Sequence, residues 1–337
     1  MIDLSTEYLG LKLANPLVPS ASPLSKDLDA AIRLEDAGAS AIVMYSLFEE
    51  KIAAEWMQMD RFIFTQSVGF GEAESFHPTP KSVKTYQEHY LENLQKLKSC
   101  LQIPVIASLN GCSLGGWLEY GHALQQAGAD ALELNVYYVA ADANDDALAV
   151  ENRYIDILTA LRKQVTLPLT VKLSPQFSSP LNFVQRLQQA GANGVALFNR
   201  FYQPDIDLDS LQIIPKLELS TPAESLLRIR WTALMHGRVD LSLAVTGGFH
   251  RIEDALKALL AGADVVHLCS VLLEHGPQRL TEMLQELAQW LEEHEYRSVQ
   301  QLKGSVSHQH AINPGEYERA NYVNILDSYT PAPGVLW

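Results

Sequence analysis

The sequence predicts a (β/α)8 barrel, and three features predict it: a motif repeated four times, eight apolar runs and a length of 337 residues. The motif is Ala-Gly-Ala, at residues 37–39, 127–129, 190–192 and 261–263, each time between a helix-like segment and an apolar run. Glycine takes the left-handed conformation that ends a helix, and small alanines let the helix pack tightly on a sheet. Apolar strands that alternate with helices indicate a parallel sheet covered on both faces. Eight such units indicate a TIM barrel, with an open doubly wound sheet as the alternative.

The strands are expected at eight places along the chain. In order, the apolar runs occupy residues 15–20, 41–45, 103–108, 131–135, 167–172, 194–198, 240–246 and 265–269. The helices between them are amphipathic, and the segment 279–292 shows this most clearly. Its apolar face consists of Leu280, Met283, Leu284, Leu287, Trp290 and Leu291.

Two insertions and a C-terminal tail interrupt this alternation of strands and helices. We expect residues 1–337 to form a single domain. The insertions span about 48–80, after the second strand, and about 200–222, after the sixth. Both leave the carboxyl ends of strands, where barrel active sites are built, so we expect a lid or small subdomain there. The tail, about 296–337, carries four tyrosines and is expected to pack on the barrel or on a partner subunit.

Composition narrows the function classes. The net charge of −15 argues against nucleic-acid binding and against an anionic membrane surface, both of which attract clustered Lys and Arg. No apolar run approaches the roughly 20 residues of a membrane span. The three cysteines have no paired spacing, which predicts neither a disulfide framework nor a metal site. With no signal-peptide pattern at the start, we expect a cytoplasmic protein that acts on a small molecule.

Polar or small residues stand at the carboxyl end of every predicted strand. Because these ends meet at the mouth of a barrel, they predict a cofactor site there. In chain order they are Ser20, Ala21 and Ser22; Tyr45 and Ser46; Ser108 and Asn110; Asn135, Tyr137 and Tyr138; Lys172 and Ser174; Asn199 and Arg200; Thr246, Gly247 and Gly248; Cys269 and Ser270.

Three groups of these residues suggest particular chemistry. The Gly247-Gly248 pair lies after the seventh strand, where barrels of this kind bind phosphate, although a plain turn is the alternative. Lys172 ends an apolar strand. It is a candidate for a cation beside a cofactor ring, for a Schiff-base lysine, or for a lysine that only reaches solvent. Amides at three strand ends suit a ring with both donors and acceptors, such as a flavin or a pyrimidine, and the alternative is turn capping. They are Asn110, Asn135 and Asn199.

With these motifs the chain resembles the class 1 dihydroorotate dehydrogenases, which are FMN-dependent barrel enzymes, over most of residues 1–290. It is most similar to a bacterial subgroup called dihydroorotate dehydrogenase-like. The strings that carry the resemblance lie at residues 10–16, 20–24, 106–111, 134–135, 171–175, 197–204, 246–248, 252–254, 261–264 and 269–270.

The resemblance implies a role for each matching residue. The ring of FMN would contact Ala21, Ser22, Ser46, Asn110, Asn135, Lys172 and Asn199. The phosphate would be held by Gly247, Gly248, Cys269 and Ser270. Substrate would meet Tyr45, Gln66, Asn135, Asn199 and Arg200. Lys172 would stabilise the anionic reduced ring, and the protein would be a homodimer.

On the substrate side the chain departs from the family. Tyr45 stands where the family has a lysine, and Gln66 where it has an asparagine. Tyr138 replaces the family's Cys or Ser base and Tyr137 the residue before it. Ala140 replaces the family's second asparagine. The lost lysine contact, the lost hydrogen bond of this asparagine and the higher pKa of tyrosine together approach ~5 kcal/mol.

The predicted function follows. We expect an FMN-dependent oxidoreductase of dihydroorotate or a related CH–CH substrate, with hydride passing to flavin N5. Tyr138 is the expected base, helped by Lys172 or Arg200, with Tyr137 and Cys112 as substitutes. Lys51 or Arg200 would compensate for the missing lysine. The alternatives are a lysine-dependent aldolase or lyase, and a flavin-binding protein without catalysis.

Overall fold

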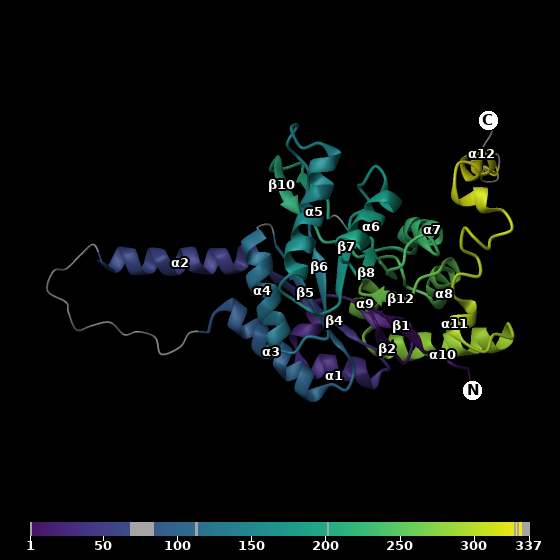
Figure 1. Cartoon of the computed structure of the whole chain (residues 1–337), viewed down its shortest axis with the longest axis horizontal. Helices are drawn as coiled ribbons and strands as arrows, with labels where there is room; N and C mark the ends of the chain where they lie inside the picture. Colours follow the sequence, from purple (N-terminus) through teal and green to yellow (C-terminus); the bar gives the residue numbers. More distant parts are fainter. Residues whose placement is uncertain are drawn as a thin grey trace.

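Eight parallel strands form one sheet in the computed structural model, which describes residues 2–67, 84–111, 114–200, 202–326, 328 and 330–331 (Figure 1). Their order is β3-β12-β11-β8-β7-β6-β5-β4, which follows the chain once around a circle. The strands are β3 (Leu17–Pro19), β4 (Ile42–Phe48), β5 (Val105–Asn110), β6 (Ala131–Asn135), β7 (Leu169–Leu173), β8 (Gly194–Leu197), β11 (Ser242–Thr246) and β12 (Val265–Leu268). All eight lie at the predicted places.

The two ends of the sheet meet, which closes the barrel. Near the starts of β3 and β4, Ser40 Oγ donates to the Leu17 carbonyl at 3.2 Å. Asn15 Nδ2 donates to the Gly38 carbonyl at 2.8 Å. The predicted (β/α)8 barrel is therefore confirmed, and the open doubly wound sheet is wrong.

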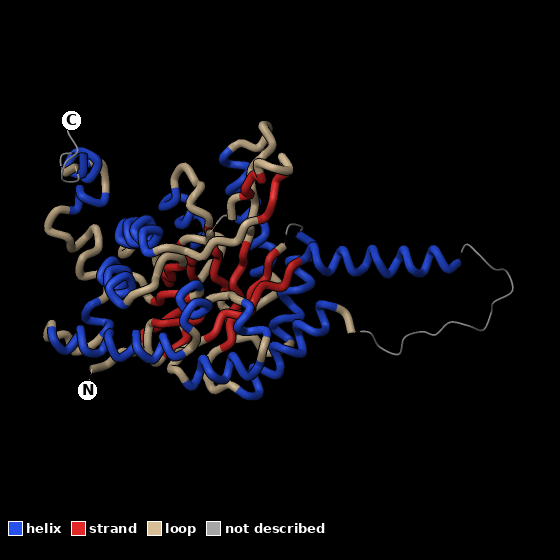
Figure 2. Tube along the Cα trace, turned by 180° about the vertical axis from the view of Figure 1, so that it is seen from behind, coloured by secondary structure: helices blue, strands red, loops and turns tan. Residues whose placement is uncertain are grey.

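Helices surround the strands (Figures 1 and 2). They are α1 (Leu28–Asp36), α3 (Tyr86–Cys100), α4 (Leu114–Gln126), α5 (Ala147–Arg162), α6 (Pro180–Gln189), α7 (Ser225–Met235), α8 (Ile252–Ala261), α9 (Ser270–His275) and α10 (Gln278–Glu293). Short 3-10 turns occur at η1 (Pro23–Lys26), η2 (Pro222–Glu224) and η3 (Pro314–Tyr317). The α8 helix ends at Gly262 with φ 115°, as the Ala-Gly-Ala motif predicts.

A hairpin that the sequence analysis did not predict fills the amino end of the barrel. It consists of β1 (Thr6–Tyr8) and β2 (Leu11–Leu13), which pair antiparallel. Tyr8 and Leu9 are buried against the inward-facing residues of the barrel strands. The Leu9 N–H donates to Ser242 Oγ at 2.9 Å. The hairpin thus closes the end opposite to the predicted site.

Both insertions begin at carboxyl ends of strands. The first continues as α2 (Glu49–Ser67), which extends away from the barrel (Figures 1 and 2), and residues 68–83 lie outside the described part of the chain. The second forms an antiparallel hairpin of β9 (Pro204–Asp207) and β10 (Gln212–Pro215).

The tail packs on the barrel over its first part. It contains α11 (Val299–Leu302), η3 and α12 (Ala320–Leu326). The N–H groups of Gly304 and Val306 donate to the last carbonyls of α8, those of Leu259 and Leu260, at 3.0 and 2.9 Å. Within the described residues, no helix combines the length and the apolar character that crossing a membrane requires.

Candidate active site

Two adjoining cavities open at the carboxyl ends of the barrel strands. Their volumes are about 510 Å³ and about 360 Å³. The residues that line both are Ala21, Ser22, Pro23, Lys172, Asn199 and Tyr202. Because the cavities share this wall, they form one elongated cleft that suits a long ligand rather than two separate small ones.

The three predicted asparagines line the first cavity. Asn135 ends β6, and Asn199 follows β8, where its N–H donates to the Leu173 carbonyl at 2.7 Å. Asn199 Nδ2 donates to Asn135 Oδ1 at 2.8 Å. An amide has two donors and an acceptor, so this pair still offers the Asn135 amide hydrogens and the Asn199 carbonyl to a ring in the cleft.

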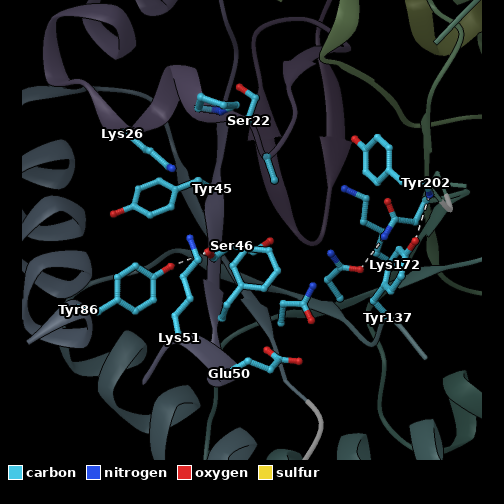
Figure 3. Close-up of a pocket in the computed structure, with 16 residues that line it drawn as sticks. Ser22, Lys26, Tyr45, Ser46, Glu50, Lys51, Tyr86, Tyr137, Lys172 and Tyr202 are labelled. Carbon is cyan, nitrogen blue, oxygen red and sulfur yellow. Dashed lines mark hydrogen bonds between the residues drawn. The ribbon is translucent and has the colours of Figure 1, made fainter. Parts of the chain in front are cut away.

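Lys172, labelled in Figure 3, lines both cavities and is only 6% exposed. Its Nζ lies 3.2 Å from Glu133 Oε1, a carboxylate inside the barrel. The lysine that only reaches solvent is therefore the wrong alternative. A neighbouring serine pair completes this wall, since the Oγ atoms of Ser46 and Ser108 lie 2.8 Å apart.

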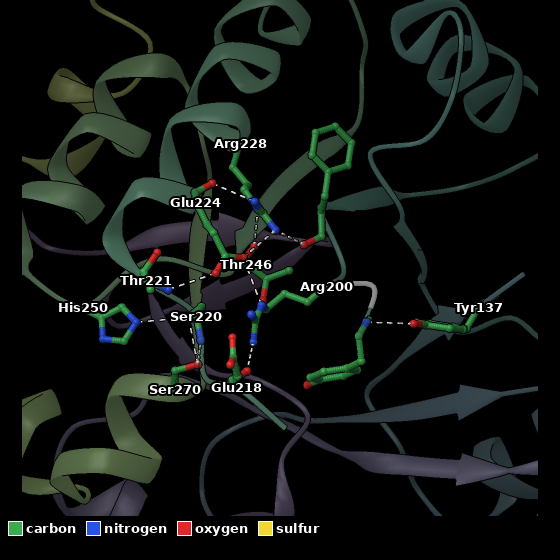
Figure 4. A network of polar contacts seen from close by, with 12 residues as sticks. Tyr137, Arg200, Glu218, Ser220, Thr221, Glu224, Arg228, Thr246, His250 and Ser270 are labelled. Carbon is green, nitrogen blue, oxygen red and sulfur yellow. Dashed lines mark hydrogen bonds and ion pairs between the residues drawn. The ribbon is translucent and has the colours of Figure 1, made fainter. Parts of the chain in front are cut away.

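The second cavity ends at the glycine pair. Gly247 and Gly248 have φ of +91° and +93°, which favours glycine. Ser220, from the second insertion, donates its N–H to Ser270 Oγ at 3.0 Å, and its Oγ lies 3.1 Å from His250 Nε2 (Figure 4). The sequence analysis missed Ser220, because its only signal was its place in an insertion.

Cys269 also lines this second cavity. Burial raises the pKa of its thiol, and the positive charges of Lys172 and Arg200 partly oppose that rise. The thiol form is therefore favoured here.

Two arginines form hydrogen bonds and ion pairs at this end of the cleft. Arg228, which the sequence analysis also missed, is buried and donates to the carbonyls of Thr246 at 3.0 Å and Phe198 at 3.2 Å. Arg200 pairs with Glu224 Oε2 at 3.0 Å. Arg200 lines the second cavity and not the one with Tyr45, so the structure separates it from the predicted substrate side.

The outer wall of the first cavity is aromatic and carries two lysines. Tyr45 and Tyr86 stand on one side of it, close to Lys26 and Lys51, and Tyr137 stands on the other (Figure 3). Lys51 Nζ lies 5.5 Å from the centre of the Tyr86 ring. Lys26, which the sequence analysis did not single out, lies 5.3 Å from that of Tyr45. Lys51 thus lines the same cavity as Tyr45, the position at which the resemblance predicts that a lysine is missing. This is the place that the predicted compensation by Lys51 requires.

Two predicted residues lie outside what the structure describes. They are Cys112 and the side chain of Gln66.

The two adjacent tyrosines have different surroundings. Tyr137 lines the first cavity, and its Oη accepts from the Tyr202 N–H at 3.1 Å (Figure 4). Burial raises its pKa. Tyr138 is not among the residues that line the two cavities. Its hydroxyl donates to Asp145, which raises its pKa, and its cationic neighbour is Arg153, 4.0 Å from the ring centre. The structure thus brings Tyr137 to the cleft and does not bring Tyr138, Lys172 and Arg200 together.

Comparisons with known proteins agree with this geometry. A family model described as dihydroorotate dehydrogenase matches residues 79–291. The catalytic subunit of dihydroorotate dehydrogenase B (NAD(+)) from Thermoplasma volcanium is 24% identical over 325 residues, which cover 90% of this chain and 98% of the relative. The NAD-dependent dihydropyrimidine dehydrogenase subunit PreA of Escherichia coli (strain K12) is 24% identical over 344 residues, with 95% and 80% covered.

Proposed function

Because the chain belongs to the dihydroorotate dehydrogenase family, we propose that it is an FMN-dependent oxidoreductase that acts on a CH–CH bond of dihydroorotate or a related substrate. The observation that carries this proposal is the continuous cleft. It runs from the paired amides and buried cation at Asn135 and Lys172 to the glycine pair and Ser270. A ring with donors and acceptors fits the first end, and a phosphate fits the second.

The donor set suits FMN. Asn110, Asn135 and Lys172 would hold the ring, whereas Gly248, Ser270 and Ser220 would hold the phosphate. Bound there, the flavin supplies a two-electron acceptor or donor of hydride. Lys172 would supply positive charge where negative charge develops on the ring, and its burial strengthens that interaction.

Tyr137 is the side chain that we assign to proton transfer. It lines the substrate side of the cleft, and its raised pKa keeps the hydroxyl protonated at neutral pH. A protonated tyrosine can give a proton to a substrate carbon, and in the reverse direction the resulting tyrosinate can take it back. The Tyr138 hydroxyl donates a hydrogen bond to Asp145, so Tyr138 does not replace Tyr137 in this role.

The phosphate end can be tested with a glycine substitution. A Cβ on Gly248 would lie 2.4 Å from the Ser225 nitrogen and 2.9 Å from the Thr221 carbonyl oxygen. Gly248→Ala is therefore expected to weaken FMN binding about 10- to 100-fold, since such overpacking costs about 1–3 kcal/mol. Quenching of flavin fluorescence measures the affinity, and binding of riboflavin, which lacks the phosphate, should change less.

Gly276→Ala is the matched control. Gly276 also has a positive φ, +75°, but a Cβ added to it would have no other atom within 4 Å. It shares the backbone strain without the clash. Equal losses of FMN affinity in the two variants would contradict a phosphate site at Gly248.

The visible absorbance of the bound flavin tests the activity. The purified protein, reconstituted with FMN, is expected to be yellow, and the flavin band is then followed anaerobically with dihydroorotate. We expect the flavin band to disappear over a time longer than minutes after mixing with dihydroorotate, because Tyr45 replaces the lysine that the family uses. A protein that binds no flavin would overturn the proposal, whereas bound flavin that dihydroorotate leaves oxidised would point to a related substrate.

A lysine-dependent aldolase or lyase is disfavoured by one contact. Lys172 Nζ lies 3.2 Å from the Glu133 carboxylate, and this ion pair engages the nitrogen that a Schiff base would need. Borohydride should therefore trap no adduct on Lys172 with a carbonyl substrate.

A homodimer is part of the proposal. Apolar side chains on the β9–β10 hairpin support it: Leu208 is 82% exposed, Leu211 80% and Ile213 75%. Exposed apolar groups gathered on one hairpin favour contact with another protein surface. Light scattering of the purified chain should give twice the mass of 37.4 kDa.

A further inference from the structure

A cluster of buried ionisable groups lies inside the barrel, beneath the cleft. It joins Glu133 on β6, Lys172 on β7 and His267 on β12, whose exposures are 0%, 6% and 1%. Glu133 Oε1 lies 3.2 Å from Lys172 Nζ, and Glu133 Oε2 lies 3.8 Å from His267 Nδ1. Glu133 therefore stands between the lysine and the histidine, and it lines neither of the two cavities itself.

The neighbours of this cluster are neutral at physiological pH. Burial lowers the pKa of His267 to about 4, so the imidazole carries no charge. Tyr8, which donates to Thr170 at 3.3 Å, has a pKa raised by burial, and so has Cys269. Arg200, whose charge also acts on Cys269, pairs with Glu224. The charge balance around Lys172 in the described residues is thus decided by Glu133.

Stability alone does not explain a carboxylate in this position. Within the described residues, Glu133 Oε2 and both ring nitrogens of His267 are buried without a hydrogen-bond partner. Taking such groups out of water is unfavourable, and a buried ion pair is often no more stable than apolar residues of the same volume. The cluster therefore points to a role in the chemistry of Lys172.

We propose that Glu133 is a positioning residue that holds Lys172 at the cleft and opposes its positive charge, and thereby sets the reduction potential of the bound flavin. The proposal rests on the flavin site proposed above. Without the carboxylate, the charge of Lys172 would act on a bound ring with no neighbouring counter-charge.

The test compares midpoint potentials of the FMN-loaded protein and its Glu133→Gln variant. The variant keeps the lysine without its counter-charge, so its potential should lie above that of the native protein. The difference should be about tenfold in the ratio of reduced to oxidised flavin, or ~30 mV for two electrons. The Glu133→Asp variant keeps the carboxylate charge and should stay close to the native potential.

Two further variants keep the test decisive. Lys172→Met removes the positive charge and should lower the potential, and Lys172→Met/Glu133→Gln, which has neither charge, should return it toward the native value. If Glu133→Gln alone does not fold, the rise in potential from Lys172→Met to the double variant carries the test. An unchanged potential after loss of the carboxylate, in a protein that binds FMN, would overturn this inference alone, whereas a protein that binds no flavin would overturn the proposed function with it.

Discussion

Replacement of Lys172 by methionine is expected to slow hydride transfer to the bound flavin by about 10²–10³-fold, the usual loss when one preorganised charge is removed from an active site. Lys172 lines both cavities and is almost fully buried, so no solvent screens it. Stopped-flow reduction with a dihydronicotinamide measures the effect without requiring the natural substrate. Affinity for FMN should change much less than the rate.

The same substitution leaves a buried carboxylate without its partner. Breaking a buried ion pair on one side costs about 3–5 kcal/mol, so urea should unfold Lys172→Met at a lower concentration than the native protein. The double variant Lys172→Met/Glu133→Gln removes both charges. It should regain most of the stability and keep the slow rate, which separates chemistry from folding.

Lys257→Met is the surface control for this series. Lys257 is exposed on α8, outside the two cavities, and its replacement should alter neither rate nor stability. A native reduction rate in Lys172→Met would contradict the role of Lys172 beside the flavin.

Tyr137→Phe is expected to lower turnover of a CH–CH substrate by about 10²–10⁴-fold, the contribution of a positioned proton donor. Reduction of the flavin by a dihydronicotinamide needs no proton on a substrate carbon, so that step should keep its native rate. Tyr138→Phe is the matched control, because Tyr138 lies one residue further on and its hydroxyl is bound to Asp145. Equal losses in the two variants would contradict the assignment to Tyr137.

The pH dependence gives the same assignment a second measurement. Partial burial raises the pKa of Tyr137 above its ordinary value. The protonated donor is thus present below that raised pKa and is lost only above it. Turnover in the direction that reduces the substrate should be flat through neutral pH and fall above about pH 10. A decline near neutral pH that Tyr137→Phe abolishes would show that Tyr137 titrates lower than its burial implies.

Much of the barrel could be predicted because its signals are local. The apolar runs, the Ala-Gly-Ala helix ends and the face of the α10 helix depend on neighbouring residues and on the 3.6-residue period. The β1–β2 hairpin could not, since its residues 6–13 pair with each other only while the barrel interior covers them. Short strands of three residues carry too little pattern to be recognised alone.

The gathering of the strand-end residues in one cleft was also predictable, because in a parallel barrel every strand end reaches the same mouth. Asn135, Lys172 and Asn199 therefore had to lie near one another once the strands were known, and they line one cavity. The direction of a side chain after a strand end is not determined in this way. Tyr137 and Tyr138 differ by one position, yet only the first lines the cleft.

The sequence by itself thus determined the barrel, the strand-end polar residues and the expectation that Tyr45, Tyr137 and Tyr138 depart from the family. The tertiary structure alone decided three further points: that Tyr137 rather than Tyr138 enters the cleft, that Ser220 and Arg228 lie with the glycine pair, and that Glu133 lies against Lys172. The reason is physical. Strand periodicity places Glu133 in the barrel core, but its partner comes from β7, 39 residues away, and contacts between distant residues depend on packing that no local pattern encodes.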